Sequence, residues 1–322
     1  MLSEMLGELN ASHTGSGYRH RDSEGDNTAA LGIFLDWNYN GEGVRIQEVM
    51  DKSPLVKGDK QVEGGTIITA INGNSIIDES DFYKNLNHMA GKTILLTLEK
   101  DGNHYEKPVE AISSGADNNL RYERWVKKNR ERVDKLSNGK LGYVHVRGMN
   151  SASFREVYSE TLGRHIDKEG LVIDTRFNGG GWLHDDLATF FMGDPYVTYS
   201  PRGQDFGKEP IAKWNKPSIL LVSESNYSDA HAFPYAYQTL KIGKIVGMPV
   251  PGTMTAVWWE TQIDPTIYFG IPQVGAKDRS GNYLENQQLE PDIQVNNDYE
   301  SALMDQDKQL QRAVKELLTD VE

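Results

Sequence analysis

The spacing of apolar side chains divides the chain into stretches with different predicted architectures. Short β-branched or alternating segments fill residues 27–113, as in ALGIFLDW, GVRIQEVM, GTIITAING and KTILLTLEKDG, and they predict strands. From residue 140 onward, continuous apolar segments such as GLVIDTRF and SILLVSES alternate with segments of helical period. Because continuous apolar strands suit a sheet covered on both faces, residues 140–322 predict an α/β fold with a largely parallel sheet.

Helical and polar segments fill the remaining stretches. A helix is predicted after Asp78 or Ser80, either of which could cap it, and another is predicted over residues 114–136. Residues 1–26 are expected to hold the end of a short helix and then a polar loop, and a long loop is expected between KIVGMPV and DIQV. One face of residues 114–136 is rich in Lys and Arg, which we interpret as a solvated helix face.

Composition and charge narrow the possible classes of protein. The chain has 322 residues, of which 38% are hydrophobic and 25% charged, so it can bury a core. Its formal net charge of −13 argues against nucleic acid as a partner, because an acidic surface repels phosphate. The absence of cysteine excludes disulfides, a thiol nucleophile and thiolate metal ligands. No apolar run is long enough to span a membrane, and the acidic start MLSEMLGELN lacks the pattern of a signal peptide.

A glycine-rich junction follows the first buried strand, in VIDTRFNGGGW. In α/β folds, such junctions between a strand and a helix are where ligands bind. Gly179, Gly180 and Gly181 permit close approach of another group and expose backbone N–H groups that suit negative charge, with a plain tight turn as the alternative. A phosphate-binding loop is excluded, because no Gly-Lys-Ser/Thr follows and the spacing is not GxGxxG.

Ser228 lies at a second junction, between the predicted strand SILLVSES and the helix that follows it. Its hydroxyl would be exposed beside the positive end of that helix, and the N–H of Asp229 could point at a developing oxyanion. A serine in this position is either a helix cap, which is the more common role, or a nucleophile. Pro234 predicts a kink in the same helix.

A serine nucleophile needs a base, and the histidines are the first candidates. Four of them fall within predicted strands or helices or at solvated tips and are interpreted as structural: His88, His104, His145 and His165. His231 is too close in sequence to Ser228 to face it easily. His13, in the polar N-terminal loop, and His184, one turn after the glycines, are both candidates, and spacing alone does not choose between them.

Six segments of the chain form a recognisable series: ELNASHTGSGYR at 8–19, the PDZ-like block 27–113, GKLGYVHVRGMNSASF at 139–154, KEGLVIDTRFNGGG at 168–181, SESNYSDAHAFPYAY at 223–237 and LENQQLEPDI at 284–293. In this order they resemble the C-terminal, protease half of the tricorn-type proteases, within the tail-specific (C-terminal processing) serine peptidase superfamily. The resemblance implies a parallel-core α/β catalytic domain of the ClpP/crotonase-like class with an inserted PDZ-like β-rich domain. It divides the chain into an N-terminal piece of the catalytic region (1–26), the PDZ-like domain (27–113) and the α/β peptidase domain (114–322).

The resemblance also implies a catalytic tetrad. Ser228 corresponds to the nucleophile, and His13 to the general base. Ser12 would hydrogen-bond the histidine or bridge it to a carboxylate, and Glu285 would orient that relay. These roles meet a physical need, because a base requires a partner that fixes its tautomer.

Two further groups of residues follow from the same resemblance. The backbone N–H groups of Gly180 and Asp229 would form an oxyanion hole, which requires two donors aimed at the developing charge. In the PDZ-like block, Leu31, Gly32 and Ile33 resemble the loop that holds the C-terminal carboxylate of a peptide while the peptide adds a strand. The alternative is that this block is a spacer whose groove is occluded.

The identity of the general base distinguishes this chain from many bacterial members of the superfamily that it resembles. In those relatives a downstream lysine is the base, but Thr253 occupies the corresponding position, and the nearest lysines, Lys241 and Lys244, come earlier. Histidine is therefore favoured. No cofactor is expected, and a metal site built from His184 and the two aspartates that follow it lacks the HExxH spacing or any comparable one.

We therefore expect a serine peptidase that acts on oligopeptides or unfolded chains, and that is homo-oligomeric in its full-length form. The alternatives are a PDZ-type peptide-binding module without cleavage, and a hydrolase of other acyl bonds. Because 11 residues precede Ser12, where tricorn-type proteases carry further domains, we expect a C-terminal fragment. The segment 194–205 has no clear counterpart of the acidic residue that selects basic substrates in tricorn-type proteases, so the resemblance does not extend to basic specificity and the cleavage-site preference stays open. Periplasmic and cytosolic locations are both compatible with the resemblance.

Overall fold

A computed structural model describes residues 1–19, 22, 25–58, 60–204 and 207–321. By its internal contacts the chain divides into two compact units. The first unit consists of Met1–His20 and Asn129–Glu322, and the second is Arg21–Lys128. Helix α3 (Ser114–Leu136) runs across this division.

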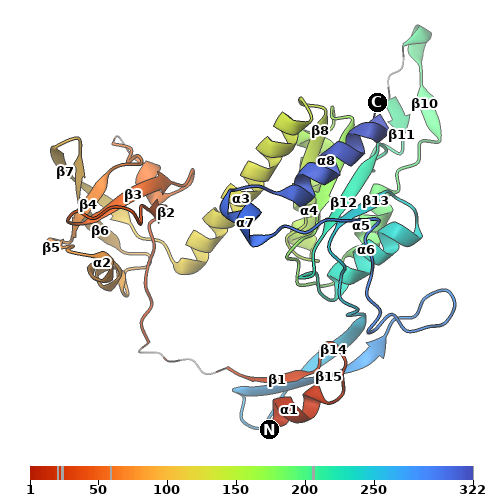
Figure 1. Cartoon of the computed structure of the whole chain (residues 1–322), viewed down its shortest axis with the longest axis horizontal. Coiled ribbons are helices and arrows are strands. Elements are labelled where there is room, and N and C mark those ends of the chain that lie inside the picture. Colours follow the sequence, from red (N-terminus) through yellow and green to blue (C-terminus); the bar gives the residue numbers. More distant parts are fainter. Residues whose placement is uncertain (20–21, 23–24, 59, 205–206, 322) are drawn as a thin grey trace. The chain divides into compact units, whose positions relative to one another are not determined.

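A parallel sheet forms the centre of the first unit (Figure 1). Its strands, in spatial order, are β16 (Ile293–Gln294), β13 (Lys244–Gly247), β12 (Ser218–Val222), β9 (Gly170–Asp174) and β8 (Leu141–His145). All neighbouring pairs are parallel. Every residue of β8, β9 and β12 is buried, as the continuous apolar sequences of β9 and β12 predict, and the expected α/β class is confirmed.

Helices pack on this sheet according to the alternation of its side chains. Leu171 and Ile173 of β9 belong to the core that includes residues of α5 (His184–Phe191) and α6 (Asp229–Thr239), whereas Val172 between them points to the opposite face. Helix α8 (Lys308–Val321) packs on β9, β12 and β13. No helix among the described residues has the length and apolar character needed to cross a membrane. The helices of this unit beyond α3 are α1 (Leu2–Gly7), α4 (Ser151–Ser159) with the π-helical turn η2 (Glu160–Arg164), α5 (His184–Phe191), the 3₁₀ turn η3 (Pro201–Gly203), α6 (Asp229–Thr239), α7 (Tyr299–Leu303) and α8 (Lys308–Val321).

An antiparallel sheet lies where the sequence pattern predicts loops. Strand β1 (Gly15–Tyr18) pairs with β15 (Ile267–Gly275), which pairs with β14 (Thr255–Thr261), and α1 lies on this sheet (Figure 1). The prediction of loops is wrong, because these strands carry no strand pattern in their sequences. Strand β1 contains two glycines and no apolar alternation, and β14 and β15 are mostly exposed or half-buried. Pairing between distant segments, rather than local pattern, makes these strands. A further small ladder joins β10 (Val197–Tyr199) and β11 (Gly207–Glu209).

The second unit is built around another antiparallel sheet. Its main path is β2 (Ile33–Leu35), β3 (Val44–Val49), β4 (Ile67–Ile71), β6 (Thr93–Lys100) and β7 (Asn103–Glu110), and β5 (Asn74–Ser75) pairs with β4. A 3₁₀ turn, η1 (Pro54–Val56), follows β3. Helix α2 (Glu79–Leu86) begins after Asp78, whose side chain accepts the backbone N–H of Asp81 at 3.1 Å. The predicted strands and the cap by Asp78 are confirmed.

Candidate active site

The turn that carries Ser228 and the glycine loop after β9 lie against each other. They follow the neighbouring parallel strands β12 and β9, so they meet at one edge of the sheet. A Cβ atom added to Gly180 would lie 2.6 Å from the Cβ of Ser228 and 3.1 Å from the backbone N of Asp229. Gly180 also has a φ of +98°. Only glycine fits at this position, because a side chain would push the two loops apart.

Ser228 occupies the N-cap position of α6 but does not cap the helix. Its side chain makes no capping hydrogen bond, and its backbone angles (φ 58°, ψ −124°) lie outside the regions that non-glycine residues usually adopt. Such a conformation costs on the order of 1–3 kcal/mol and persists only where its surroundings hold it. Here the N–H of Ser228 donates to Thr253 Oγ1 at 2.8 Å, and the N–H of Tyr227 donates to the Asn178 carbonyl at 3.1 Å. The helix-cap interpretation is therefore wrong.

Ser12, His13 and Glu285 form a continuous hydrogen-bonded series. The backbone N–H and the hydroxyl of Ser12 donate to the two carboxylate oxygens of Glu285, at 2.5 Å and 3.0 Å. Ser12 Oγ also lies 2.9 Å from Nδ1 of His13. Because the Ser12 proton points to Glu285, its oxygen accepts the Nδ1 proton, which leaves Nε2 of the imidazole unprotonated. The series thus selects the tautomer that a general base needs.

Thr255, at the start of β14, adds a second hydroxyl to this series. Its Oγ1 lies 2.7 Å from Ser12 Oγ and 3.0 Å from His13 Nδ1, and its hydroxyl donates to the Ser12 carbonyl at 3.0 Å. Thr255 therefore braces both residues of the Ser12–His13 pair. No local sequence signal marks this role, because Thr255 reaches the site only through the pairing of β14 with β15.

His13 is half-buried and lies beside the Ser228 turn. Its backbone N–H donates to the Tyr227 hydroxyl at 2.7 Å, and the centroids of the two rings are 4.8 Å apart. Burial lowers the pKa of His13 below its ordinary value, and the negative charge of Glu285 opposes this shift only in part. His13 is therefore neutral near pH 7. Among the described residues, the side-chain hydrogen bonds of His13 go to Ser12 and Thr255, and none joins it to Ser228.

His184, the other candidate base, is paired with a carboxylate. Its Nδ1 lies 2.5 Å from Oδ1 of Asp229, and the Oδ2 atom of Asp229 accepts the backbone N–H groups of Leu183 and His184 at 2.5 Å and 3.0 Å. The hydrogen bond to Asp229 raises the pKa of His184 above its ordinary value. Because the backbone N–H of His13 binds Tyr227, the neighbour of Ser228, and its Nδ1 is held by Ser12, His13 is the better candidate for the base.

The two amides expected to bind an oxyanion are neighbours with different partners. The N–H of Asp229 is at the first position of α6, where a helix offers no internal acceptor. The N–H of Gly180 donates to Asn178 Oδ1 at 2.9 Å. Within the part of the chain that the structure describes, the N–H of Asp229 therefore has no acceptor, and the N–H of Gly180 is already hydrogen-bonded.

The buried histidines have structural partners. Nδ1 of His231 accepts the N–H of Thr253 at 3.2 Å, and burial lowers the pKa of His231 to about 4. Nε2 of His165 lies 3.0 Å from the Tyr143 carbonyl, and burial lowers the pKa of His165 to about 4 as well. His145 is buried and bonds to a backbone carbonyl. Across the residues that the structure describes, no group of three or more His, Asp or Glu side chains is arranged to hold a metal ion.

The loop of the second unit that resembles a carboxylate-binding loop is occupied by the chain itself. The N–H of Gly32 donates to Asp117 Oδ1 of α3 at 3.1 Å, and Asp117 is ion-paired with Arg121 at 2.6 Å. A Cβ atom added to Gly32 would lie 3.0 Å from Leu120 Cδ1. Arg121 also donates to the Ile33 carbonyl at 3.4 Å. The N-terminal part of α3 thus covers this loop.

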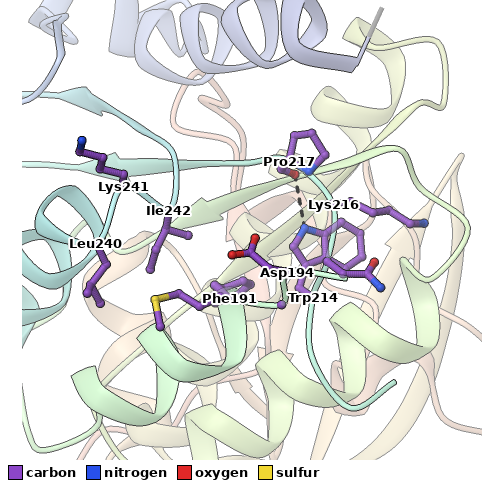
Figure 2. A pocket seen from close by; sticks show the side chains of 11 residues that line it. Phe191, Asp194, Trp214, Lys216, Pro217, Leu240, Lys241 and Ile242 are labelled. Carbon is purple, nitrogen blue, oxygen red and sulfur yellow. Dashed lines mark hydrogen bonds between the residues drawn. The ribbon is translucent and has the colours of Figure 1, made fainter. Parts of the chain in front are cut away.

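A separate pocket lies at the other end of the parallel sheet (Figure 2). It is lined by residues that precede β12 and β13, among them Lys216, Pro217 and Ile242, together with Trp214, whose indole N–H donates to the Pro217 carbonyl at 3.3 Å. Ser228 follows the opposite end of β12. This pocket is therefore not part of the Ser228 site.

Comparison with known proteins relates the chain to one family of peptidases. Residues 140–295 match the model of peptidase family S41. Tricorn protease of Thermoplasma volcanium is 26% identical over the whole chain, and the match covers 32% of that relative. A tricorn protease homolog of Saccharolobus solfataricus is 26% identical over 98% of the chain and is covered over 30% of its length.

The solved crystal structure of tricorn protease has the same fold as this chain. The two superpose with a TM-score of 0.87 at 23% sequence identity, over 99% of this chain and 32% of the other. The chain therefore spans about a third of the length of the relatives it matches.

Proposed function

We propose that this chain is the catalytic part of a serine peptidase, on the premise that residues 140–295 match the model of peptidase family S41. The observation that carries the proposal is the hydrogen-bonded series Glu285–Ser12–His13, which ends beside the strained turn of Ser228. The substrates would be oligopeptides or unfolded chains. The relatives bear the name tricorn protease, and a homo-oligomeric whole protein is part of the proposal.

In this proposal Ser228 and His13 carry the chemistry. Ser228 Oγ attacks the carbonyl carbon of the peptide bond, and Nε2 of His13 takes the hydroxyl proton. The imidazolium then gives that proton to the leaving amine, which breaks the C–N bond and leaves an acyl-enzyme. A water molecule, deprotonated by His13, attacks the acyl carbon; the bond from that carbon to Ser228 Oγ breaks, and the imidazolium returns the proton to Ser228 Oγ. Neutral His13 is the form that can begin this cycle, and its lowered pKa supports the assignment.

Ser12, Thr255 and Glu285 would act as positioning residues. Nδ1–H of His13 donates into the two hydroxyls, and the carboxylate of Glu285 stabilises the imidazolium through Ser12. Catalytic hydrogen bonds are often absent before substrate binds. The missing bond between His13 and Ser228 would therefore form in the substrate complex.

The oxyanion of the tetrahedral intermediate would lie against the N–H of Asp229 and the N–H of Gly180. The first has no helical acceptor, as a donor reserved for a ligand requires. The second would be shared between its present acceptor, Asn178 Oδ1, and the oxyanion. The close contact of Gly180 with Ser228 supports this placement, because both donors must lie about 3 Å from the reacting carbonyl oxygen.

The positions of the residues downstream of Ser228 disfavour a lysine as the general base. Thr253 binds the N–H of Ser228 through its hydroxyl, and the downstream Lys244 is paired with Glu316 at 2.7 Å. The alternative function, a PDZ-type peptide-binding module, is disfavoured because the N–H of Gly32 is already bonded to Asp117.

Fluorophosphonate labelling of the full-length protein tests the proposal. We expect a single label on Ser228 and hydrolysis of unfolded substrates, both abolished in Ser228→Ala. Ser280→Ala, on an exposed turn, is the matched control and should behave as the parent. A Ser228→Ala enzyme that still hydrolysed peptides would refute the assignment.

A further inference from the structure

The side chain of Asp229 links the two loops that would supply the oxyanion donors. Asp229 begins α6, yet its carboxylate reaches the start of α5 and accepts the N–H groups of Leu183 and His184 at 2.5 Å and 3.0 Å. Its other oxygen lies 2.5 Å from Nδ1 of His184. The Asp229 side chain is 5% exposed, and that of His184 is 32% exposed. A buried carboxylate is thus fully engaged by three donors, two of them backbone amides.

This linkage spans a short segment. Leu183, whose N–H is held by Asp229, comes three residues after Gly180. Gly181, between them, forms a parallel bridge with Met149, whose N–H donates to the Gly180 carbonyl at 3.0 Å. The segment after Gly180 is therefore fixed on one side by Met149 and on the other by the carboxylate of Asp229.

We propose that His184 and Asp229 form a latch that sets the separation of the two oxyanion donors. The inference rests on the proposed function, in which the backbone N–H of Asp229 is one donor and that of Gly180 is the other. One residue then supplies a donor from its backbone while its side chain fixes the loop of the second donor. His184 completes the latch by holding the carboxylate in one rotamer. In this proposal it is a positioning residue rather than a catalytic one, because it acts on the oxyanion donors only through the carboxylate of Asp229.

A latch differs from a simple helix cap in what its loss would change. Losing a cap lowers stability but leaves the geometry of a folded active site intact. Losing a latch displaces donors that act only on the tetrahedral intermediate, so kcat falls while KM changes little. The same displacement weakens a peptide aldehyde, whose hemiacetal oxygen occupies the oxyanion position, without weakening a product peptide.

The test compares His184→Ala with His184→Asn in the full-length protein. The side-chain amide of Asn places an N–H near the position of Nδ1, so it restores the bond to Asp229. We expect His184→Ala to lose about 10- to 100-fold in kcat, less than the loss of a whole donor, with KM within about twofold. The inhibition constant of a peptide aldehyde should rise by the same factor, and His184→Asn should recover most of both losses.

Controls separate the latch from other effects. Asp186→Asn, an exposed residue of the same first turn of α5, should keep the parental kcat. If His184→Ala does not fold, Asp229→Asn, which keeps the size and one acceptor oxygen, should show the same loss of kcat and of aldehyde affinity. Circular dichroism and thermal melting establish folding for each variant.

Two outcomes overturn the inference. The first is an active parent whose folded His184→Ala or Asp229→Asn variant keeps the parental kcat, and the second is a loss of kcat with unchanged aldehyde affinity. A parent that neither takes the fluorophosphonate label nor hydrolyses peptides overturns the proposed function itself, and the latch with it.

Discussion

The carboxylate of Glu285 accepts both the backbone N–H and the hydroxyl of Ser12, at 2.5 Å and 3.0 Å, across a sequence separation of 273 residues. Two hydrogen bonds to the same residue fix the direction of the Ser12 hydroxyl. Since that hydroxyl oxygen also lies 2.9 Å from Nδ1 of His13, the orientation of the imidazole depends on Glu285.

Replacing Glu285 by Gln should reduce kcat by on the order of 100-fold. The amide keeps the size and one acceptor but removes the charge that stabilises protonated His13. Since that charge raises the pKa of His13, its removal lowers the pKa further, and the acidic limb of the kcat/KM profile should move to lower pH. A pH–rate profile of both enzymes measures the shift. A limb that stayed in place would argue against the relay.

Replacing Gly180 by Ala should abolish most of the activity. The added Cβ would lie 2.6 Å from the Cβ of Ser228, and the φ of +98° strains any side chain. We expect a loss of at least about 100-fold in kcat. Gly179→Ala is the matched control, since nothing lies within 4 Å of its added Cβ, and it should remain active. Equal activity of the two variants would contradict the contact between the two loops.

Thr255→Val should lower kcat by roughly 3- to 10-fold, the effect of losing a neutral hydrogen bond. The valine keeps the shape but cannot bond to Ser12 or His13. Thr255→Ser retains the hydroxyl and should recover most of the activity. Steady-state kinetics of the three enzymes measure kcat. A Thr255→Ser variant with a kcat as low as that of Thr255→Val would assign Thr255 a packing role instead.

Two buried histidines should make the fold sensitive to mild acid. Burial lowers the pKa of His165 and of His231 to about 4, so below pH 6.5 the unfolded chain binds protons that the folded chain does not. Stability should therefore fall as pH drops from 6.5 to 5, by up to about 1.4 kcal/mol per pH unit for each histidine. Urea unfolding at several pH values tests this. His231→Gln should flatten the slope, and the exposed His104→Gln should leave it unchanged.

Asp117→Ala should destabilise the second unit by about 1–3 kcal/mol, because it leaves the buried N–H of Gly32 without an acceptor. Asp117→Asn keeps an acceptor oxygen and should cost less. Thermal unfolding compares the two variants.

We also expect the parent not to bind peptides through a C-terminal carboxylate. Peptide binding that is lost when the peptide C-terminus is amidated would contradict the interpretation that the Gly32 loop is occupied by Asp117.

The sequence predicts those parts of the molecule whose signals are local. Continuous apolar runs identify β9 and β12, and Asp78 identifies the start of α2, because burial on both faces and helix capping act within a few residues. The strands β1, β14 and β15 carry no such signal, since each exists through pairing with a distant partner.

The same distinction applies to the candidate site. Spacing alone leaves His13 and His184 equal, and only the family resemblance separates them before folding. In three dimensions Ser12 and Thr255 lie against Nδ1 of His13, Glu285 binds Ser12, and Asp229 binds His184. The strain at Ser228 has no sequence signal either, because it arises from contacts with Thr253 and the glycine loop.

The pairing of β1 with β15 has a consequence for biosynthesis. His13 precedes a strand whose partner lies around residue 270, and the side chain of Ser12 is hydrogen-bonded to Glu285 and Thr255. A ribosome therefore releases the imidazole long before the segments that orient it. If the proposed function holds, the nascent chain would lack an oriented base until residue 285 has emerged.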